Sequence, residues 1–255
     1  MTDQKLAIVS GSGTGIGQGV TVELAKAGYD VAVHYFGSKE GAMETVEKCL
    51  AHGVRAQAFQ ADLSKKDEID GFFARATAFL GGLTLYVNNS GVTQGMPFEE
   101  ITEEHFDFLV GVDMKSALFC VQAAAKEMIH TQTKGNIVVI ASNHAMMQRY
   151  RFTVYGMIKA ALIKMVKHTA VELARFGIRV NAIAPGWVST PRVIRTADYD
   201  AAVRSIPMRR MATSEEVAQM VLFYESPAAN SITGNCILAD GGYTLLNDAP
   251  EAYGF

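Results

Sequence analysis

The stretch that decides the fold lies close to the N-terminus and reads Leu6-Ala7-Ile8-Val9-Ser10-Gly11-Ser12-Gly13-Thr14-Gly15-Ile16-Gly17. An apolar run of strand length comes first, and Val20, Leu24 and Ala27 follow the glycines at helical spacing. A strand, a glycine-rich turn and a helix begin a βαβ unit. Such a turn can hold a pyrophosphate, because glycine permits close backbone approach and the helix N-terminus offers unpaired N–H groups. Tight packing is the alternative reason for the glycines.

Six further apolar runs of strand length follow, separated by stretches long enough for helices. The runs are 31–33, 56–59, 83–87, 137–140, 179–183 and 236–238, and the helical stretches are 40–52, 66–80, 103–129, 154–176 and 214–225. Because the runs lack polar alternation, the strands need cover on both faces. We therefore predict an α/β fold, a doubly wound (Rossmann) sheet of seven mostly parallel strands flanked by helices.

Composition narrows the class of protein further. The chain has 255 residues, 49% of them hydrophobic, which is enough to fill a core. Its formal net charge of −3 provides no positive electrostatic potential to attract nucleic acid or an anionic membrane. Three cysteines without close spacing suggest neither a disulfide framework nor a zinc site, which fits a reducing cytoplasm. The start of the chain is unlike a signal peptide, and no apolar run approaches the roughly 20 residues that cross a bilayer. We expect one cytoplasmic domain over residues 1–255.

Two segments break the regular alternation. Residues 187–211 are irregular and follow the sixth predicted strand, which indicates a substrate lid above the carboxyl edge of the sheet. A solvated surface loop is an equal alternative. Five arginines lie in this excursion: Arg192, Arg195, Arg204, Arg209 and Arg210. The second segment, residues 244–255, is a C-terminal tail, which we predict to pack on a neighbouring subunit.

Several short blocks, in this order, resemble the short-chain dehydrogenase/reductase superfamily. The blocks are the glycine turn, Asn88-Asn89-Ser90-Gly91, Ser142, Tyr155-Gly156-Met157-Ile158-Lys159, Pro185-Gly186-Trp187-Val188-Ser189-Thr190, Ser214-Glu215-Glu216-Val217-Ala218, Thr233-Gly234 and Asp240-Gly241-Gly242. The resemblance runs from Lys5 to Tyr243. It implies an NAD(P)(H)-dependent oxidoreductase that interconverts a carbonyl and a secondary alcohol.

The resemblance also implies which residues contact the cofactor. They are Gly11, Gly15, Ile16, Gly17, Asp62, Leu63, Asn88, Ser90, Gly91, Tyr155, Lys159, Pro185, Gly186, Val188 and Thr190. The second strand ends near Tyr35 without a carboxylate, and Ser38 and Lys39 follow within reach. Because no carboxylate there would repel the 2′-phosphate of NADP(H), this cofactor is favoured. NAD(H) stays open, because the basic residues often found at positions 14 and 36 in the family's NADP-preferring members are absent.

Tyr155 and Lys159 are four residues apart on a predicted helix, so they share one face and the ammonium favours the phenolate. Tyr155 then exchanges a proton with a substrate oxygen, Ser142 hydrogen-bonds the same oxygen, and the cofactor supplies the hydride. One departure stands out. Asp113 occupies a position where the family usually has asparagine, and it brings a charge near Lys159. It either holds a water in a proton relay or satisfies helix backbone.

The substrate is less clearly indicated. Polar residues where the family's substrates approach, namely Gln94, Ser142, His144, Gln148 and Tyr155, favour a sugar, polyol or small keto compound. No second ligand stands at metal spacing from His144, so we expect no metal. A 3-ketoacyl-type reductase, an epimerase or lyase on the same fold, and a non-catalytic dinucleotide sensor are the alternatives. Tetramers are common in this family, and the long apolar helices fit contacts between subunits, so we predict a homotetramer.

Overall fold

The predicted strands form one parallel sheet in the computed structural model, which describes residues 5–196 and 198–246. The strands are β1 (Leu6–Val9), β2 (Asp30–Tyr35), β3 (Ala56–Gln60), β4 (Leu85–Asn88), β5 (Asn136–Ile140), β6 (Arg179–Pro185) and β7 (Cys236–Ala239). Their order is β3-β2-β1-β4-β5-β6-β7, and every neighbouring pair is parallel. This order confirms the predicted doubly wound sheet, whose strand order reverses between β1 and β4.

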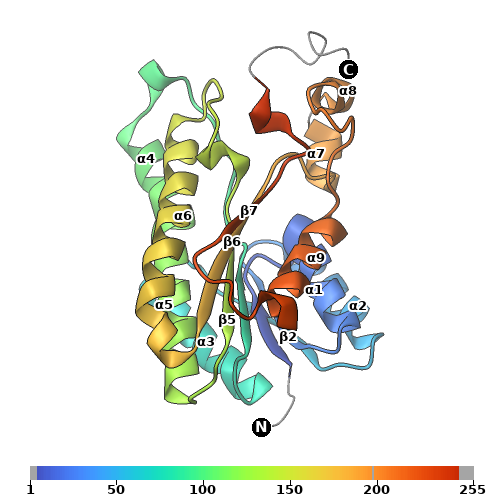
Figure 1. The fold of residues 1–255 in the computed structure, drawn as a ribbon, viewed down its shortest axis with the longest axis vertical. Coiled ribbons are helices and arrows are strands. Elements are labelled where there is room, and N and C mark those ends of the chain that lie inside the picture. Colours follow the sequence, from blue (N-terminus) through green and yellow to red (C-terminus); the bar gives the residue numbers. More distant parts are fainter. Residues whose placement is uncertain (1–4, 197, 247–255) are drawn as a thin grey trace.

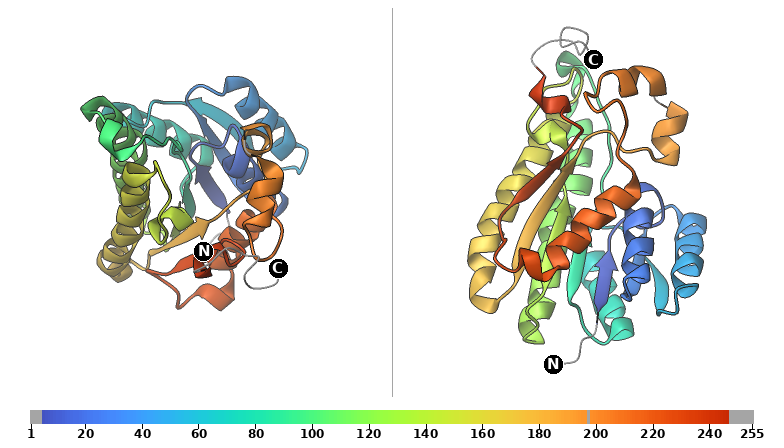
Figure 2. Two further views of the ribbon diagram at one scale, coloured as in Figure 1. Left: turned by 90° about the horizontal axis from the view of Figure 1, so that it is seen from above. Right: turned by 45° about the vertical axis from the view of Figure 1, so that its right-hand side comes forward.

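Helices cover both faces of the sheet (Figures 1 and 2). One face carries α1 (Gly15–Lys26), α2 (Lys39–Leu50) and α9 (Ser214–Glu225), and the other carries α3 (Lys66–Leu80), α5 (Ser116–His130) and α6 (Thr153–Leu173). Each face has its own buried core, one around Val9 and Tyr224 and the other around Phe72 and Tyr86. The continuous apolar strands are therefore covered on both sides, as a parallel sheet requires.

Shorter helices lie near the carboxyl edge. They are α4 (Glu103–Leu109), α7 (Pro191–Thr196) and α8 (Tyr199–Arg204), with 3₁₀ turns at Phe98–Glu100, Asn143–Ala145 and Tyr243–Leu245. Two further 3₁₀ turns, Ala174–Phe176 and Pro227–Ala229, lie at the other edge, beside the start of β6. The segment 187–211 was predicted to be irregular, but it contains α7 and α8 and packs on a small cluster of Ala202, Ile206 and Met211. The predicted tail lies outside the described residues from 247 onward.

The predicted helix over 103–129 is continuous but not uniform. A π-helical turn, Val110–Lys115, joins α4 to α5. The joined segment Glu103–His130 is 28 residues long and has a window of mean hydropathy 1.4, so by length and composition alone it could cross a membrane. The segment contains no unbroken apolar run of that length, because Asp113 and Lys115 interrupt it. Here α5 packs on α3, α6 and β4 as part of the core.

The glycine turn after β1 is held by a buried histidine of β2. The Gly11 N–H donates to His34 Nδ1 over 3.0 Å, and His34 Nε2 lies 3.1 Å from the Ala61 carbonyl oxygen. Because Nδ1 accepts, the proton sits on Nε2 and the ring is neutral. Burial lowers the pKa of His34 to about 4, despite the opposing effect of the Ala61 carbonyl. The neutral ring thus ties the turn to the end of β3.

The pKa of His34 predicts an acid-sensitive stability. An unfolded histidine binds a proton near pH 6.5, whereas the folded ring stays neutral until about pH 4, so folding stability falls as the pH falls through this window. His34→Gln keeps an acceptor and a donor but does not titrate. As the pH falls from 6.5 to 4, we expect the unfolding free energy of this variant to increase, relative to that of the native protein, by up to about 1.4 kcal/mol per pH unit.

Denaturant titrations at several pH values measure this difference. The exposed His130→Gln substitution is the control and should follow the native protein at every pH. Parallel curves for His34→Gln and the native protein would contradict the assignment.

Candidate active site

A cavity of about 1570 Å³ lies at the carboxyl edge of the sheet, where the strand order reverses. The loops after β1 to β6 contribute to its wall, and so do residues of α7, the helix labelled in the upper part of Figure 1. The predicted site residues that line it are Gly11, Gly15, Ile16, Tyr35, Ser38, Asp62, Leu63, Ser90, Gly91, Ser142, His144, Tyr155, Lys159, Pro185, Gly186, Val188 and Thr190. Residues from six separate loops therefore meet around one space.

The glycine turn fits a dinucleotide. Gly11 and Gly15 have φ of 64° and 59°, in the left-handed region that glycine adopts readily. A Cβ added to Gly15 would lie 3.6 Å from Thr190 Cγ2, so the turn and the segment after β6 approach to van der Waals distance, and both line the cavity. The unpaired N–H groups at the start of α1 lie beside this space and could hold a pyrophosphate.

The other glycines of the turn are explained by packing. Added Cβ atoms would lie 2.4 Å from Ser38 Oγ at Gly13, 2.3 Å from the Gly11 oxygen at Gly17, and 2.3 Å from Ser214 Cβ at Gly19. Such distances leave no room for a side chain. Packing, one of the two reasons for glycine that the sequence left open, therefore applies at these three positions.

Tyr155 and Lys159 share the buried face of α6, and the Lys159 Nζ lies 5.2 Å from the centre of the Tyr155 ring. Asp113, from the π-helical turn, approaches from the other side. Its Oδ2 lies 3.0 Å from Lys159 Nζ, and its Oδ1 accepts a 2.7 Å hydrogen bond from the Val92 N–H. The carboxylate is completely buried, so this ion pair is sheltered from solvent.

The charge on Lys159 depends on these neighbours. Burial by itself lowers the pKa of Lys159, but the Tyr155 oxygen and the Asp113 carboxylate outweigh burial and raise the net pKa above 10.5. The lysine is therefore an ammonium at neutral pH. Its positive charge is shared between the phenol oxygen and the carboxylate.

Ser142 follows β5 by two residues and is held by His144. Ser142 Oγ lies 3.3 Å from His144 Nδ1 and accepts a 3.3 Å hydrogen bond from the His144 backbone N–H. His144 Nε2 is buried and has no hydrogen-bond partner within the described ranges 5–196 and 198–246. An orphaned buried N–H is rarer than an orphaned acceptor, so we assign the proton to Nδ1. Ser142 Oγ then accepts twice, and its own proton points either to Asn143 Oδ1, at 3.5 Å, or to a ligand that offers a better acceptor.

Comparison with known proteins identifies the family. Residues 11–244 match the family model described as Enoyl-(Acyl carrier protein) reductase. The chain is 34% identical to the uncharacterized oxidoreductase YohF of Escherichia coli, over 95% of this chain and 97% of that protein. It is 33% identical to the 3-oxoacyl-[acyl-carrier-protein] reductase FabG of Staphylococcus epidermidis, over 93% and 98% of the two chains.

A solved structure supports the same assignment. The crystal structure of acetoin dehydrogenase from Enterobacter cloacae matches with a TM-score of 0.90 at 31% identity and covers 97% of this chain and 98% of that one. The chain belongs to the short-chain dehydrogenase/reductase superfamily. It is an oxidoreductase of a family that uses NAD(P)(H), and the resemblance that the sequence indicated is confirmed.

Not every predicted site residue of this dehydrogenase/reductase lines the cavity. Those that do not are Gly17, Lys39, Gln94, Asn88, Asp113 and Gln148. Lys39, Gln94 and Gln148 are exposed side chains on the surface. Asn88 is buried at the end of β4, where its Oδ1 accepts from the Tyr86 hydroxyl over 3.0 Å. Asn88 and Asp113 thus support the wall from behind, because their polar atoms are already bonded to protein.

Other residues line the cavity without having been predicted. Lys48 lies on α2 and pairs with Glu44 over 2.6 Å. Gly41, Glu44 and Lys48 have helical spacing, so they share one face, and this periodicity could have revealed the lysine in place of Lys39. Phe152 and Trp187 also belong to the wall. No sequence spacing joins these two aromatic residues, because α6 and β6 separate them.

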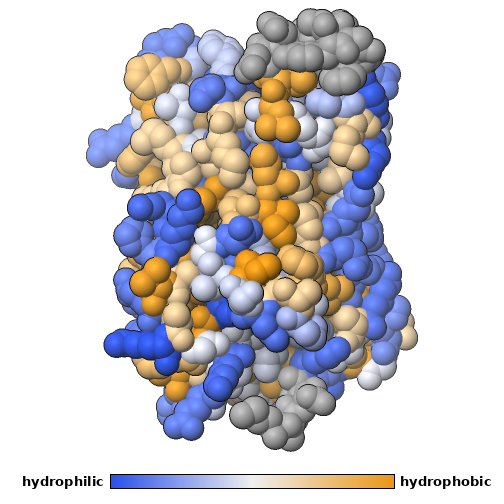
Figure 3. Space-filling view, in the orientation of Figure 1, coloured by the Kyte–Doolittle hydropathy of each residue, from blue (hydrophilic) through white to orange (hydrophobic). Residues whose placement is uncertain are grey.

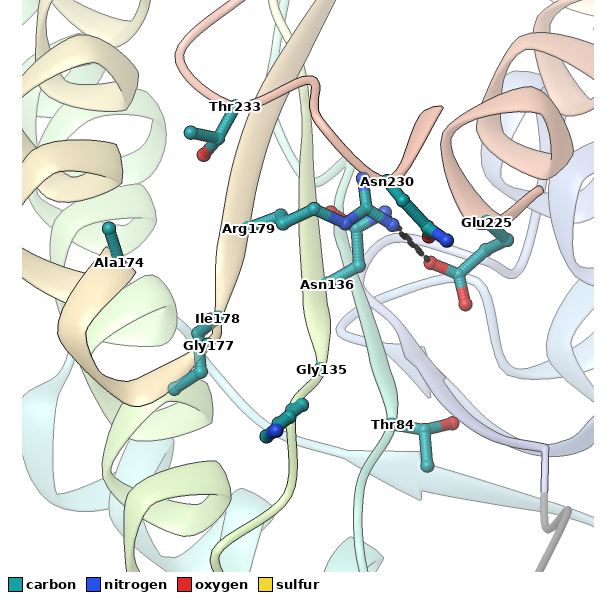
Figure 4. A pocket seen from close by; sticks show the side chains of 11 residues that line it. Thr84, Gly135, Asn136, Ala174, Gly177, Ile178, Arg179, Glu225, Asn230 and Thr233 are labelled. Carbon is teal, nitrogen blue, oxygen red and sulfur yellow. Dashed lines mark hydrogen bonds and ion pairs between the residues drawn. The ribbon is translucent and has the colours of Figure 1, made fainter. Parts of the chain in front are cut away.

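A second cavity lies at the opposite edge of the sheet (Figure 4) and measures about 510 Å³. Arg179 crosses it and points toward Glu225, with their charged atoms 3.9 Å apart. Its guanidinium already donates to the carbonyl oxygens of Tyr224, Ala229 and Ile232. These bonds fix the start of β6 to the residues after α9 and leave the guanidinium occupied by the protein itself. This cavity is therefore not the candidate active site.

The Asp113–Lys159 contact predicts distinct effects for two substitutions. Asp113→Asn keeps an acceptor for Val92 and removes the charge that competes with Tyr155 for Lys159, so turnover should be kept or improved. Asp113→Leu leaves the ammonium buried without a counter-charge and should cost about 3–5 kcal/mol of stability. Denaturant unfolding and steady-state kinetics measure the two effects. Complete loss of turnover in Asp113→Asn, with cofactor still bound, would contradict the prediction.

Proposed function

We propose that the chain interconverts a carbonyl and a secondary alcohol on a small polar substrate, such as a sugar, polyol or keto compound. The observation that carries the proposal is the presence of Ser142, Tyr155 and Lys159 on one wall of a cavity whose opposite end is a glycine turn. The acetoin dehydrogenase of Enterobacter cloacae, named for a small keto compound, is similar in fold and sequence. A non-catalytic sensor would have no need for a buried lysine beside a tyrosine.

Each polar side chain has one task in the proposed reaction. The cofactor, when bound, supplies the hydride in reduction or accepts it in oxidation. Tyr155 donates its hydroxyl proton to the carbonyl oxygen, and the Lys159 ammonium favours the phenolate that remains. Ser142 donates a second hydrogen bond to the same oxygen as negative charge develops there. His144 keeps the serine proton pointed away from itself, because both of its N–H groups donate to Ser142 Oγ.

NADP(H) is the favoured cofactor in this proposal, and NAD(H) is the alternative. The end of β2 has no carboxylate to repel a 2′-phosphate, since Tyr35 and Phe36 stand there. Ser38 and Lys48 line the cavity beside it, while Lys39 does not. The carboxylate of Glu44 pairs with Lys48 and partly neutralises its charge, which weakens the preference for NADP(H) over NAD(H).

The 3-ketoacyl-type reductase remains the second candidate, because FabG from Staphylococcus epidermidis is 33% identical over nearly its full length. An epimerase or lyase would reuse the same residues, so only turnover can distinguish it. Such enzymes leave no net change in the nicotinamide.

The function is tested by a substrate panel with NADPH and NADH in parallel. We expect reduction of a small ketone or sugar with both nucleotides and the higher kcat/KM with NADPH. Tyr155→Phe should lower kcat by about 10²–10⁴, because the proton donor is lost. The control is Tyr150→Phe, at an exposed tyrosine outside the cavity wall, which should retain full activity. No nucleotide oxidation with any compound would favour the sensor.

We also propose that four copies assemble. Large apolar side chains are exposed on α5 and α6, including Leu118, Met157 and Val171. Figure 3 shows apolar surface along β7 and beside it on α6. Burying these surfaces against further copies would remove them from water, and the family is commonly tetrameric.

Light scattering after size-exclusion chromatography tests the assembly. We expect four times the 27.6 kDa of one chain. Val171→Glu should shift the mass to dimers or monomers, because it places a charge in the contact. Leu50→Glu, at an equally large exposed side chain on α2, should leave the mass unchanged. A monomeric native protein would reject the proposal.

A further inference from the structure

Arg149 is held against two aromatic rings on the cavity wall. It lies in the loop between β5 and α6, and its guanidinium carbon is 5.4 Å from the centre of the Phe152 ring and 4.9 Å from that of Trp187. Phe152 precedes α6, whereas Trp187 follows β6, so two separate elements contact the cation. Stacking on aromatic faces attracts a guanidinium and leaves its N–H edge available for hydrogen bonds.

The stacked arginine stands one aromatic ring away from the proposed proton donor. The Phe152 ring centre lies 6.1 Å from that of Tyr155, and the His144 ring packs edge-on against both at 5.2 Å. Burial first, and then the charges of Arg149 and Lys159, lower the pKa of His144 to about 4. The imidazole is therefore neutral at physiological pH. The positive charge near Tyr155 that faces the cavity mouth belongs to the arginines.

No carboxylate compensates Arg149 within residues 5–196 and 198–246, where no ion pair to it occurs. Arg192 and Arg195 line the cavity as well. The acids on the wall are Glu44, Asp62 and Asp107. Glu44 pairs with Lys48, and Asp62 contacts Ser64 and Lys65, so both are occupied near the β2 and β3 ends. Asp107 is the remaining acid of the wall, and no ion pair joins it to Arg149 among the described residues, so Arg149 brings an uncompensated positive charge to the wall although the chain carries a net charge of −3.

The pyrophosphate position does not account for this charge. The glycine turn follows β1, and Arg149 follows β5, with β4 between them. Two strand spacings separate the loops by roughly 10 Å. The loop that carries Arg149 therefore starts two strands away from the glycine turn, and the described residues show no contact between Arg149 and that turn.

We propose that Arg149, stacked on Phe152 and Trp187, binds an anionic oxyacid group of the substrate while Ser142 and Tyr155 bind its carbonyl oxygen. The inference rests on the proposed function and narrows it to ketones or secondary alcohols that carry a carboxylate or a phosphate. A guanidinium binds either group through two parallel N–H···O bonds. The carboxylate and the phosphate are distinguished by experiment.

Trp187 provides a direct measurement, because it is the only tryptophan of the chain. The full-length protein, saturated with oxidised nucleotide, is titrated with two matched pairs of ligands while its tryptophan fluorescence is recorded. The pairs are acetone with acetoacetate and dihydroxyacetone with dihydroxyacetone phosphate. We expect the anionic member of at least one pair to bind about tenfold or more tightly than its neutral partner. The pair that shows the difference identifies the anion.

Substitutions assign the effect to Arg149. Arg149→Gln should abolish the preference, and Arg149→Lys, which keeps the charge but loses the planar fork, should keep part of it. Arg151→Gln, at a neighbouring arginine outside the cavity wall, is the control and should bind as the native protein does. In turnover, Arg149→Gln should raise KM for the anionic ketone about tenfold or more with little change in kcat.

Three outcomes would overturn the proposal. One is equal binding of the charged and neutral members in both pairs by the native protein. Another is an unchanged preference in Arg149→Gln. The third is weaker nucleotide binding in Arg149→Gln, which would assign the arginine to the cofactor. If the anions bind with the expected preference and no ketone is reduced, the anion site stands and the proposed oxidoreductase function fails.

Discussion

The parallel direction of all seven strands is the constraint on which the site depends. Because every strand ends at the same edge, each loop that follows a strand delivers its polar groups to one place. Gly11 from the first loop and Thr190 from the sixth are far apart in sequence yet face the same cavity. The turn that carries Gly11 is held in turn by the neutral ring of His34. This hydrogen bond, together with those between Ser12 and the His34 backbone and between Asn89 and the Gly11 oxygen, connects the edge of the sheet to the shape of the proposed cofactor site.

The distribution of charge around that edge is uneven. Lys159 is buried and has its counter-charge in Asp113, so its ammonium acts on Tyr155 and adds little net charge to the cavity wall. Arg149, by contrast, faces the cavity with aromatic contacts in place of a carboxylate. A buried pair maintains its geometry because separating it would leave an uncompensated charge. An exposed guanidinium on aromatic rings keeps its hydrogen-bonding capacity for a ligand.

The sequence placed Tyr155 and Lys159 correctly on one helix face, and it missed several residues of the cavity wall. Tyr155 and Lys159 are one helical turn apart, and this short-range geometry does not depend on the rest of the fold. The proximity of Asp113 to Lys159 followed from the family resemblance, and the structure has the two in contact. Lys39 was predicted because it follows closely after the end of β2 in the sequence. The rotation of α2 exposes Lys39 and turns Lys48 to the cavity.

The sequence by itself determined the order of strands and helices, the glycine turn and the Tyr155–Lys159 pair. Each of these depends on the periodicity or spacing of neighbouring residues, and backbone geometry imposes both. Only the tertiary structure decided that Gln94 and Gln148 lie off the cavity wall and that Arg149 stacks between Phe152 and Trp187. Those outcomes depend on how α6 packs beside β6 and on the path of the loops between them. Such packing is settled by contacts between residues distant in the chain, which no local pattern encodes.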